Sequence, residues 1–325
     1  MSHQHRIKAL LLFVLLVFVS FSASLLIGTV KISPLELFQI LQNQGSEIQE
    51  TIIWDLRLPR VITALLVGAS LGTSGALLQG LLRNDLADPF ILGVSSGAGL
   101  VAIAMITLGI FTSWLPIAAW IGALLTSVLV FTLGQSKQGM SVERLILGGV
   151  AISAFFGSIQ TLLLLLSDDS RLQSALNWLI GSLNGRGWTD ISLVLPYILS
   201  GLCIAACLGK LINILNLGDE MAVGLGINLL RSRLIIAGVA ALLAASAVSI
   251  AGLIGFIGLI VPHSVRLIVG HDYRWVLPLS GLGGAFVLLM ADSLTRFSTV
   301  ELPVGAITAL MGAPAFAYLL HRRSH

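Results

Sequence analysis

Charged residues are scarce in this sequence. Only 10% of its 325 residues are Asp, Glu, Lys or Arg, whereas soluble domains carry roughly 25%. Hydrophobic residues make up 56% of the chain, and the mean hydropathy is +0.99. A surface with so few charges suits lipid better than water, so the composition predicts an integral membrane protein.

Cysteine is almost absent as well. The two cysteines, Cys203 and Cys207, are one helical turn apart in an apolar segment, where we expect them to be small buried residues. Two soft ligands without a nearby His make a poor metal site. We therefore expect this chain to bind neither a metal nor another cofactor.

The motifs of common enzymes are missing too. No G-x-x-x-x-G-K-[ST] motif occurs, since the only Gly-Lys pair, Gly209 and Lys210, is followed by Leu211. Neither H-E-x-x-H nor G-x-S-x-G is present. The Gly/Ser-rich run 93–99 is flanked by apolar segments, so we interpret it as the first turns of a helix, capped by Asp88 and begun by Pro89. The sequence predicts that this chain is not an enzyme.

Basic residues are scattered singly, although the net charge is +3. A nucleic-acid surface would gather them, so their placement indicates membrane topology instead.

Long apolar runs fill the chain, and about ten of them can cross a hydrocarbon core as helices. They cover residues 9–29, 60–82, 91–110, 114–134, 145–166, 190–210, 233–250, 253–269, 276–295 and 303–320. An even number of spans places both termini on one side. With the termini inside, only six of the 18 Lys and Arg lie outside, namely Lys31, Arg57, Arg60, Arg171, Arg186 and Arg296. The positive-inside rule therefore favours cytoplasmic termini.

Two polar segments interrupt the spans. Residues 167–190 are predicted to lie outside, with a short amphipathic helix, and residues 211–233 inside, as two short helices about Gly218 and Gly226. Glycines three and four residues apart, such as Gly68 and Gly72, predict close helix packing. Asp292 and Arg296 are one turn apart, so an ion pair near the outer surface is expected at least as much as a proton relay.

Several stretches, in this order, resemble one family over essentially the whole chain. They are "LRLPRVITALLVGASLGTSGALLQGLLRNDLADPFILGVSSGAGL" (56–100), "LGDEMAVGLGI" (217–227), "GLIGFIGLIVPHSVRLIVGHDYRWVLP" (252–278), "GAFVLLMADSLTR" (284–296) and "ELPVGAITALMGAPAFAYLL" (301–320). The family is that of the permease subunits of bacterial ATP-binding-cassette importers for iron-siderophore complexes, haem and cobalamin.

The resemblance implies an all-α permease fold of the type II importer kind, with residues 1–325 forming one transmembrane domain of about ten helices. It also implies four kinds of partner: a second permease subunit, identical or paralogous, two cytoplasmic ATPase subunits that bind ATP and Mg, a periplasmic binding protein, and membrane lipid. Nucleic acid is not an expected partner. The expected location is the bacterial inner membrane.

The resemblance further implies site residues. The inner segment would couple to the ATPase through Gly218, Asp219, Glu220, Ala222 and Gly226, unless it is an ordinary capped surface helix. Arg57, Arg60 and Arg296 would dock glutamates of the binding protein, with interfacial anchoring as the alternative.

The pathway is expected along the fifth span. Small and weakly polar residues there could face a partner copy, although ordinary helix packing would explain the same residues: Gly149, Ser153, Phe156, Gly157, Gln160 and Thr161. An inner gate is expected at Met140, Ser141, Val142 and Glu143.

The chain also departs from the family pattern. Tyr273 stands where relatives commonly have His, and the segment from Asp292 to Glu301 is about two residues shorter than usual, which leaves the geometry around Arg296 open.

The expected function is ATP-driven import of an iron(III)-siderophore chelate by alternating access. Haem or cobalamin import is the alternative within the family. A secondary carrier or channel is the alternative from another class, and it would need buried charges or a broken-helix ion site near the midplane, of which the sequence offers little.

Overall fold

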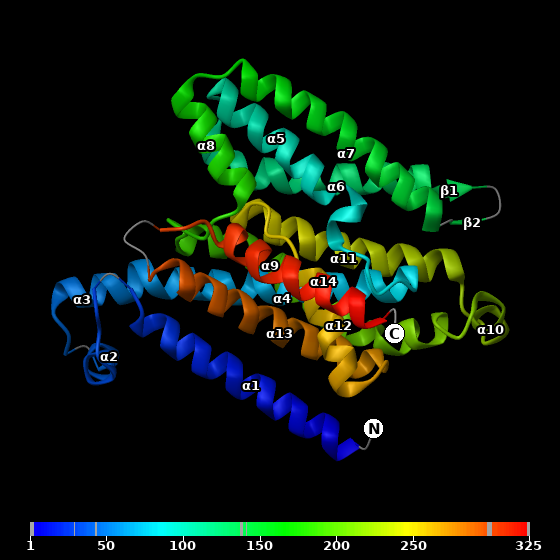
Figure 1. Ribbon diagram of the computed structural model, residues 1–325, viewed down its shortest axis with the longest axis horizontal. Coiled ribbons are helices and arrows are strands. Elements are labelled where there is room, and N and C mark those ends of the chain that lie inside the picture. Colours follow the sequence, from blue (N-terminus) through cyan, green and yellow to red (C-terminus); the bar gives the residue numbers. More distant parts are fainter. Residues whose placement is uncertain are drawn as a thin grey trace.

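The structure is a computed structural model, and it describes residues 3–28, 30–42, 44–136, 139–140, 142–297 and 301–323. Its long helices run roughly along one common direction (Figure 1). The α-helices are α1 His3–Leu26, α2 Pro34–Leu41, α3 Glu47–Thr51, α4 Leu58–Leu82, α5 Val94–Leu108, α6 Leu115–Gly134, α7 Val142–Leu165, α8 Asp169–Ile180, α9 Trp188–Leu215, α10 Asp219–Gly224, α11 Leu229–Ala251, α12 Ile257–Val269, α13 Tyr273–Thr295 and α14 Val304–Arg323.

Short elements join some of these helices. A π-helical turn, Ile52–Arg57, leads into α4, and 3-10 turns at Pro89–Leu92 and Thr112–Trp114 precede α5 and α6. The described strands are β1 Gln135–Ser136 and β2 Gly139–Met140, which pair antiparallel just before α7.

The helices confirm the predicted fold class. In the described chain, seven helical stretches are long and apolar enough to cross a membrane. They contain α1, α4, α6, α7, α9, α11 and α13, and the shorter apolar helices α5, α12 and α14 fall where the remaining three spans were predicted. The protein is therefore all-α, apart from the β1–β2 pair.

Three local predictions were wrong. Residues 211–233 contain one short helix, α10, because residues 211–215 continue α9 and α11 already begins at Leu229. Asp88 caps the 3-10 turn at Pro89–Leu92, accepting from the Phe90 backbone N–H at 2.8 Å, whereas α5 starts after Gly93 in a left-handed conformation. Cys203 and Cys207 lie on the exposed side of α9 and are not buried.

Helix α4 is the centre of the bundle. Its glycines let neighbouring backbones come close, as predicted: a methyl group added at Gly68 or Gly72 would run into carbonyl oxygens of α13, and one at Gly75 into the Gly258 oxygen of α12. Such small-residue contacts replace the hydrophobic driving force that helices lack in lipid.

The bundle has two distinct ends. Figure 1 places α2, α3 and α8 toward one end, and α10, the β1–β2 pair and both termini toward the other. The common side of the termini matches an even number of spans. We call these the α8 end and the α10 end.

Candidate coupling, docking and pathway sites

The α10 segment is fixed to the bundle through Asp219. Its carboxylate accepts from Arg83, the residue that ends α4, at 2.5 Å and from Arg233 of α11 at 2.7 Å. Arg83 also donates to the Leu215 carbonyl at the end of α9, again at 2.5 Å. The carboxylate thus joins α10 to α11 and to Arg83 at the end of α4, and Arg83 extends the link to the end of α9.

The charges around Asp219 also set its protonation state. Partial burial acts to raise the pKa of Asp219, but the hydrogen bond from Arg83 and the charge of Arg233 outweigh it and lower that pKa. Asp219 therefore stays ionised, and the link remains intact, well below neutral pH.

The other predicted coupling residues divide into two groups. Ala222 is the fully buried residue on the inner side of α10, and Gly218 and Gly226 have positive φ angles of 115° and 81°, which glycine adopts without strain. These residues shape the turn. Glu220, by contrast, is exposed.

Sequence analysis missed an apolar patch on the same segment. Leu217, Met221, Val223 and Leu225 are each more than half exposed, from 56% to 61%. The sequence offered a signal for this patch, namely four apolar side chains in a segment outside the predicted spans. A segment that faces only water would not present them together. We call these four residues the α10 patch.

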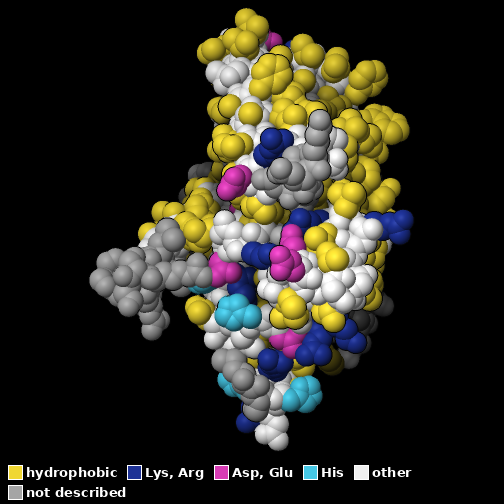
Figure 2. Space-filling model, turned by 90° about the vertical axis from the view of Figure 1, so that its right-hand side faces the viewer, with side chains coloured by type: hydrophobic (Ala, Val, Ile, Leu, Met, Phe, Trp, Pro, Cys, Tyr) yellow, Lys and Arg dark blue, Asp and Glu magenta, His cyan; other side chains and the backbone are white. Residues whose placement is uncertain are grey.

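Figure 2 looks at the α10 end of the molecule. Lys, Arg, Asp, Glu and His side chains gather over its middle and lower parts, while apolar side chains cover its upper part. The α10 end therefore has a charged surface next to an apolar one.

The three arginines predicted to dock a binding protein are buried at the opposite, α8 end of the bundle. Arg57, Arg60 and Arg296 are only 7%, 9% and 7% exposed. Arg57 donates to the carbonyls of Leu25 at 2.7 Å, of Leu26 at 3.1 Å and of Val30.

Arg60 and Arg296 share one buried acid. Asp292, which is completely buried on α13, accepts from Arg60 Nε at 2.9 Å and is also bonded by Arg296. Arg60 reaches on to Glu301 at 3.0 Å, and Arg296 to the Ser24 carbonyl at 2.9 Å. The expected Asp292–Arg296 ion pair is present, and the arginines tie α1, α4 and α13 together.

These contacts limit what the arginines offer to a partner. All three line a cavity of about 370 Å³ at the α8 end, together with Asp55 and Arg186. Each guanidinium is already bonded within the chain, so this geometry favours anchoring. Docking through them stays a prediction.

Helix α7 has two different faces. Gly149 is buried, and an added methyl there would strike the Ile91 carbonyl. Ser153 bonds the Ser96 hydroxyl at 3.2 Å, and Gln160 donates to the Ser96 carbonyl at 3.0 Å. These three predicted pathway residues therefore face the chain's own interior.

The remaining α7 residues are more open. Thr161 is exposed, Phe156 and Gly157 are half-buried, and a methyl group added at Gly157 would meet nothing within 4 Å. Large apolar side chains continue this open face: Leu147, Val150, Phe155, Leu162 and Leu165 are each at least 60% exposed.

The predicted gate is only partly described. Val142 is half-buried and Glu143 is exposed at the start of α7, while Met140 belongs to β2. Ser141 lies outside the described residues. The gate segment lies at the α10 end of the bundle (Figure 1).

Comparison with known proteins defines the class of protein. Residues 14–322 match the model of the FecCD transport family. The chain is 42% identical to the cobalamin import system permease protein BtuC of Halobacterium salinarum, over 87% of this chain and 77% of that one. It is 38% identical to the iron(3+)-hydroxamate import system permease protein FhuG of Bacillus subtilis, over 94% of each.

A solved structure extends the likeness to the fold. An inward-facing metal-chelate type ABC transporter superimposes with a TM-score of 0.89 and 34% identity, covering 97% of this chain and 99% of that one. The chain therefore belongs to the FecCD transport family and has the permease fold of a type II importer.

Proposed function

We propose that this chain is the membrane subunit of an ATP-driven importer that carries an iron(III)-siderophore chelate from the periplasm to the cytoplasm. Family membership supports the general class, a permease of an ABC importer for iron chelates, haem or cobalamin. The siderophore class is the narrower part of the proposal, and haem and cobalamin are its alternatives.

The α10 patch is the observation that carries the proposal. The short helix α10 exposes Met221 and Val223, and Asp219 and Arg83 together link it to the ends of three long helices, as a coupling element requires. An ATPase subunit that grips the patch would pass its movement to the ends of α4, α9 and α11. Apolar contact supplies the affinity, and the buried Ala222 keeps the helix seated.

The partners follow from this arrangement. ATP and Mg would be bound by two ATPase subunits on the α10 end, which would be the cytoplasmic side together with both termini. A periplasmic binding protein would approach the α8 end, over the surface that Arg57, Arg60 and Arg296 hold together. The open face of α7 would meet a second permease subunit and line the pathway with Phe156, Gly157 and Thr161.

A secondary carrier is the less favoured function. Carriers use charged groups near the middle of the membrane, whereas the buried Asp292 is neutralised by Arg60 and Arg296 near the α8 end.

The test is co-purification with the ATPase subunit. Met221→Asp places a charge in the α10 patch and should abolish ATPase capture. Phe38→Asp is the matched control, because Phe38 is 58% exposed and Met221 is 60% exposed, but Phe38 lies on α2 at the other end. Equal capture by both variants would contradict the coupling role.

Uptake by the complete importer in proteoliposomes identifies the substrate. A ferric hydroxamate, a carboxylate-bearing ferric siderophore, haem and cobalamin are offered in turn with their binding proteins, and the proposal requires ATP-dependent uptake of at least one of the first two.

A further inference from the structure

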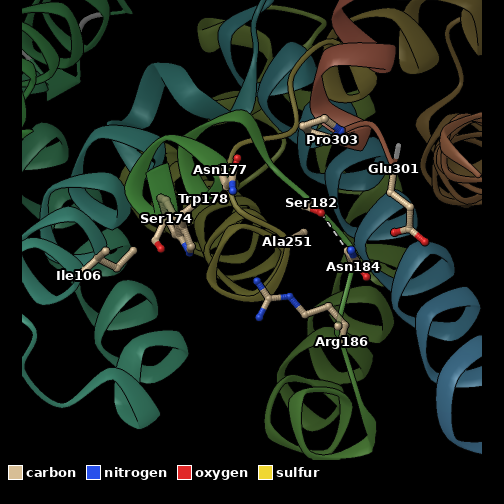
Figure 3. A pocket seen from close by; sticks show the side chains of 11 residues that line it. Ile106, Ser174, Asn177, Trp178, Ser182, Asn184, Arg186, Ala251, Glu301 and Pro303 are labelled. Atoms are coloured by element: carbon tan, nitrogen blue, oxygen red, sulfur yellow. Dashed lines mark hydrogen bonds between the residues drawn. The ribbon is translucent and has the colours of Figure 1, made fainter. Parts of the chain in front are cut away.

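A second cavity at the α8 end is lined by several side chains that can donate hydrogen bonds. It has a volume of about 470 Å³, within the range of about 300–1,000 Å³ common for small-molecule sites. Its walls come from α8, the loop 181–187, the ends of α5 and α11, and the segment before α14 (Figure 3).

Two buried donors in this wall have no hydrogen-bond partner among the described residues. They are the indole Nε1 of Trp178, a residue only 7% exposed, and the Nε of Arg186. Leaving a buried donor unpaired is unfavourable, because the donor has given up its hydrogen bonds to water. Buried polar groups are usually paired, so two unpaired donors in residues that line one cavity favour a ligand that accepts hydrogen bonds.

Arg186 also brings a positive charge that is poorly balanced. Its nearest described carboxylate, Asp190, is 3.9 Å away, too far for a hydrogen bond. Burial lowers the pKa of Arg186, and Asp190 offsets this only in part, although a guanidinium remains protonated. Figure 3 shows its side chain reaching from the loop into the space beside α8.

The other polar groups of the wall fit the same ligand. Ser174, Asn177 and Asn184 add a hydroxyl and two amides. Glu301 is the acid in the lining, but Arg60 pairs with it at 3.0 Å and offsets its charge. The cavity therefore favours an anionic oxygen ligand.

The frame of the cavity is fixed by the backbone. The Ser182 N–H donates to the Ala251 carbonyl at 2.9 Å, and the Gly305 N–H donates to the Gly181 carbonyl at 3.2 Å. On α8, Arg171 donates to the Thr107 carbonyl of α5 at 2.9 Å. The donors are thus held in place before a ligand arrives, which reduces the entropic cost of binding.

We propose that this cavity binds a carboxylate group of the transported chelate at the outer mouth of the permease, with Arg186 and Trp178 as its donors. That the ligand is the transported chelate rests on the proposed function, whereas the carboxylate site itself does not. A guanidinium and an indole N–H can each donate to one of the two oxygens of a carboxylate. Such directed hydrogen bonds select a carboxylate more strictly than charge attraction alone does.

Binding is tested on the purified chain in nanodiscs, with citrate as the probe and titration calorimetry as the readout. Trp178→Phe keeps an aromatic ring but removes the pyrrole half of the indole together with its N–H, so citrate affinity should fall about tenfold. Arg186→Gln should weaken it by about 10- to 100-fold, because a charged donor is lost.

Two controls match these changes. Trp188→Phe alters a tryptophan at the same end that already donates to the Trp54 carbonyl and lies outside the cavity, so citrate affinity should not change. Triethyl citrate has the same skeleton without charge and should not bind. If Arg186→Gln fails to fold, Arg186→Lys keeps the charge but removes Nε and should still weaken binding.

The results that would contradict the carboxylate site differ from those that would contradict the proposed function. Equal citrate affinity in the natural chain, Trp178→Phe and Arg186→Gln overturns the site, whether or not the importer transports anything; so does equal binding of triethyl citrate. In the complete importer, Trp178→Phe should reduce uptake of a carboxylate-bearing ferric chelate more than that of a trihydroxamate. Failure of all uptake with variant-sensitive citrate binding would instead count against the proposed function.

Discussion

Helices α4 and α7 have nearly the same hydropathy but opposite surroundings. The most apolar 18 residues of their spans have mean hydropathies of 1.8 and 1.7, yet 83% of these 18 residues are buried in the chain for the α4 span and only 11% for α7. Glycines line α4 where other backbones approach, whereas Leu, Val and Phe cover the open face of α7. In lipid, apolar character does not decide which helix is central; side-chain size does.

The difference in burial also suggests different roles for the two helices: α4 supports the structure of the subunit, and α7 takes part in transport. A helix enclosed by α11, α12 and α13 serves as the frame of the subunit, and the arginine cluster locks its α8 end. A helix with an open face is free to meet a second subunit or the substrate. Substitutions on α4 and its partners should therefore affect folding, and those on α7 should affect transport.

The largest effect is expected at Asp292, which pairs with Arg60 near the start of α4. Asp292→Ala leaves two buried arginines without their acid, and removing one member of a buried ion pair costs about 3–5 kcal/mol. The measurement is the thermal midpoint in detergent. Glu143→Ala, at the exposed start of α7, is the control and should change stability by less than about 0.5 kcal/mol. Equal losses of stability in the two variants would contradict the different structural roles of α4 and α7.

A smaller effect is expected from two matched glycines. Gly75→Ala pushes a methyl group against the Gly258 carbonyl and should destabilise the protein by about 1–3 kcal/mol. Gly157→Ala meets open space on α7 and should stabilise the chain by about 0.4–1 kcal/mol. Thermal midpoints of both variants are compared with the natural chain. A loss at Gly157 as large as that at Gly75 would show that a second subunit packs tightly there.

Local features of the bundle could be predicted from the sequence. Apolar runs predict the spans because membrane thickness fixes their length, and paired glycines predict close packing because the spacing of three or four residues lies on one helix face. The predicted spans and the Gly68–Gly72 contacts are confirmed for this reason.

Features that depend on distant partners could not be predicted. The bonds that Arg57 and Arg60 make within the chain could not be predicted, because their partners include the Leu25 carbonyl and Asp292, which are 32 and 232 residues away. On α7, Ser153 and Gln160 would suit either a pathway or a packed interface, and only the position of Ser96 on α5 assigns them to packing.

The smallest effect is expected at Asp88, in the turn that leads from α4 to α5, the helix on which α7 packs. Burial raises the pKa of Asp88 to about 6 from 3.8, although the Phe90 N–H opposes this shift. Because the folded state holds the proton more tightly, this residue's contribution to stability is complete below about pH 4 and is lost as the pH rises through about 6.

Asp88→Asn tests this contribution, because Asn keeps an acceptor for Phe90 and carries no charge. The midpoint of the natural chain relative to the variant should fall between about pH 4 and pH 6, by about 1–2 °C, since the partly exposed side chain is screened by water. Taking the difference between the two proteins removes the titration of every other group. Parallel profiles would mean that Asp88 is as well solvated as an ordinary surface acid, and that the turn between the buried frame and the open helices adds no pH dependence of its own.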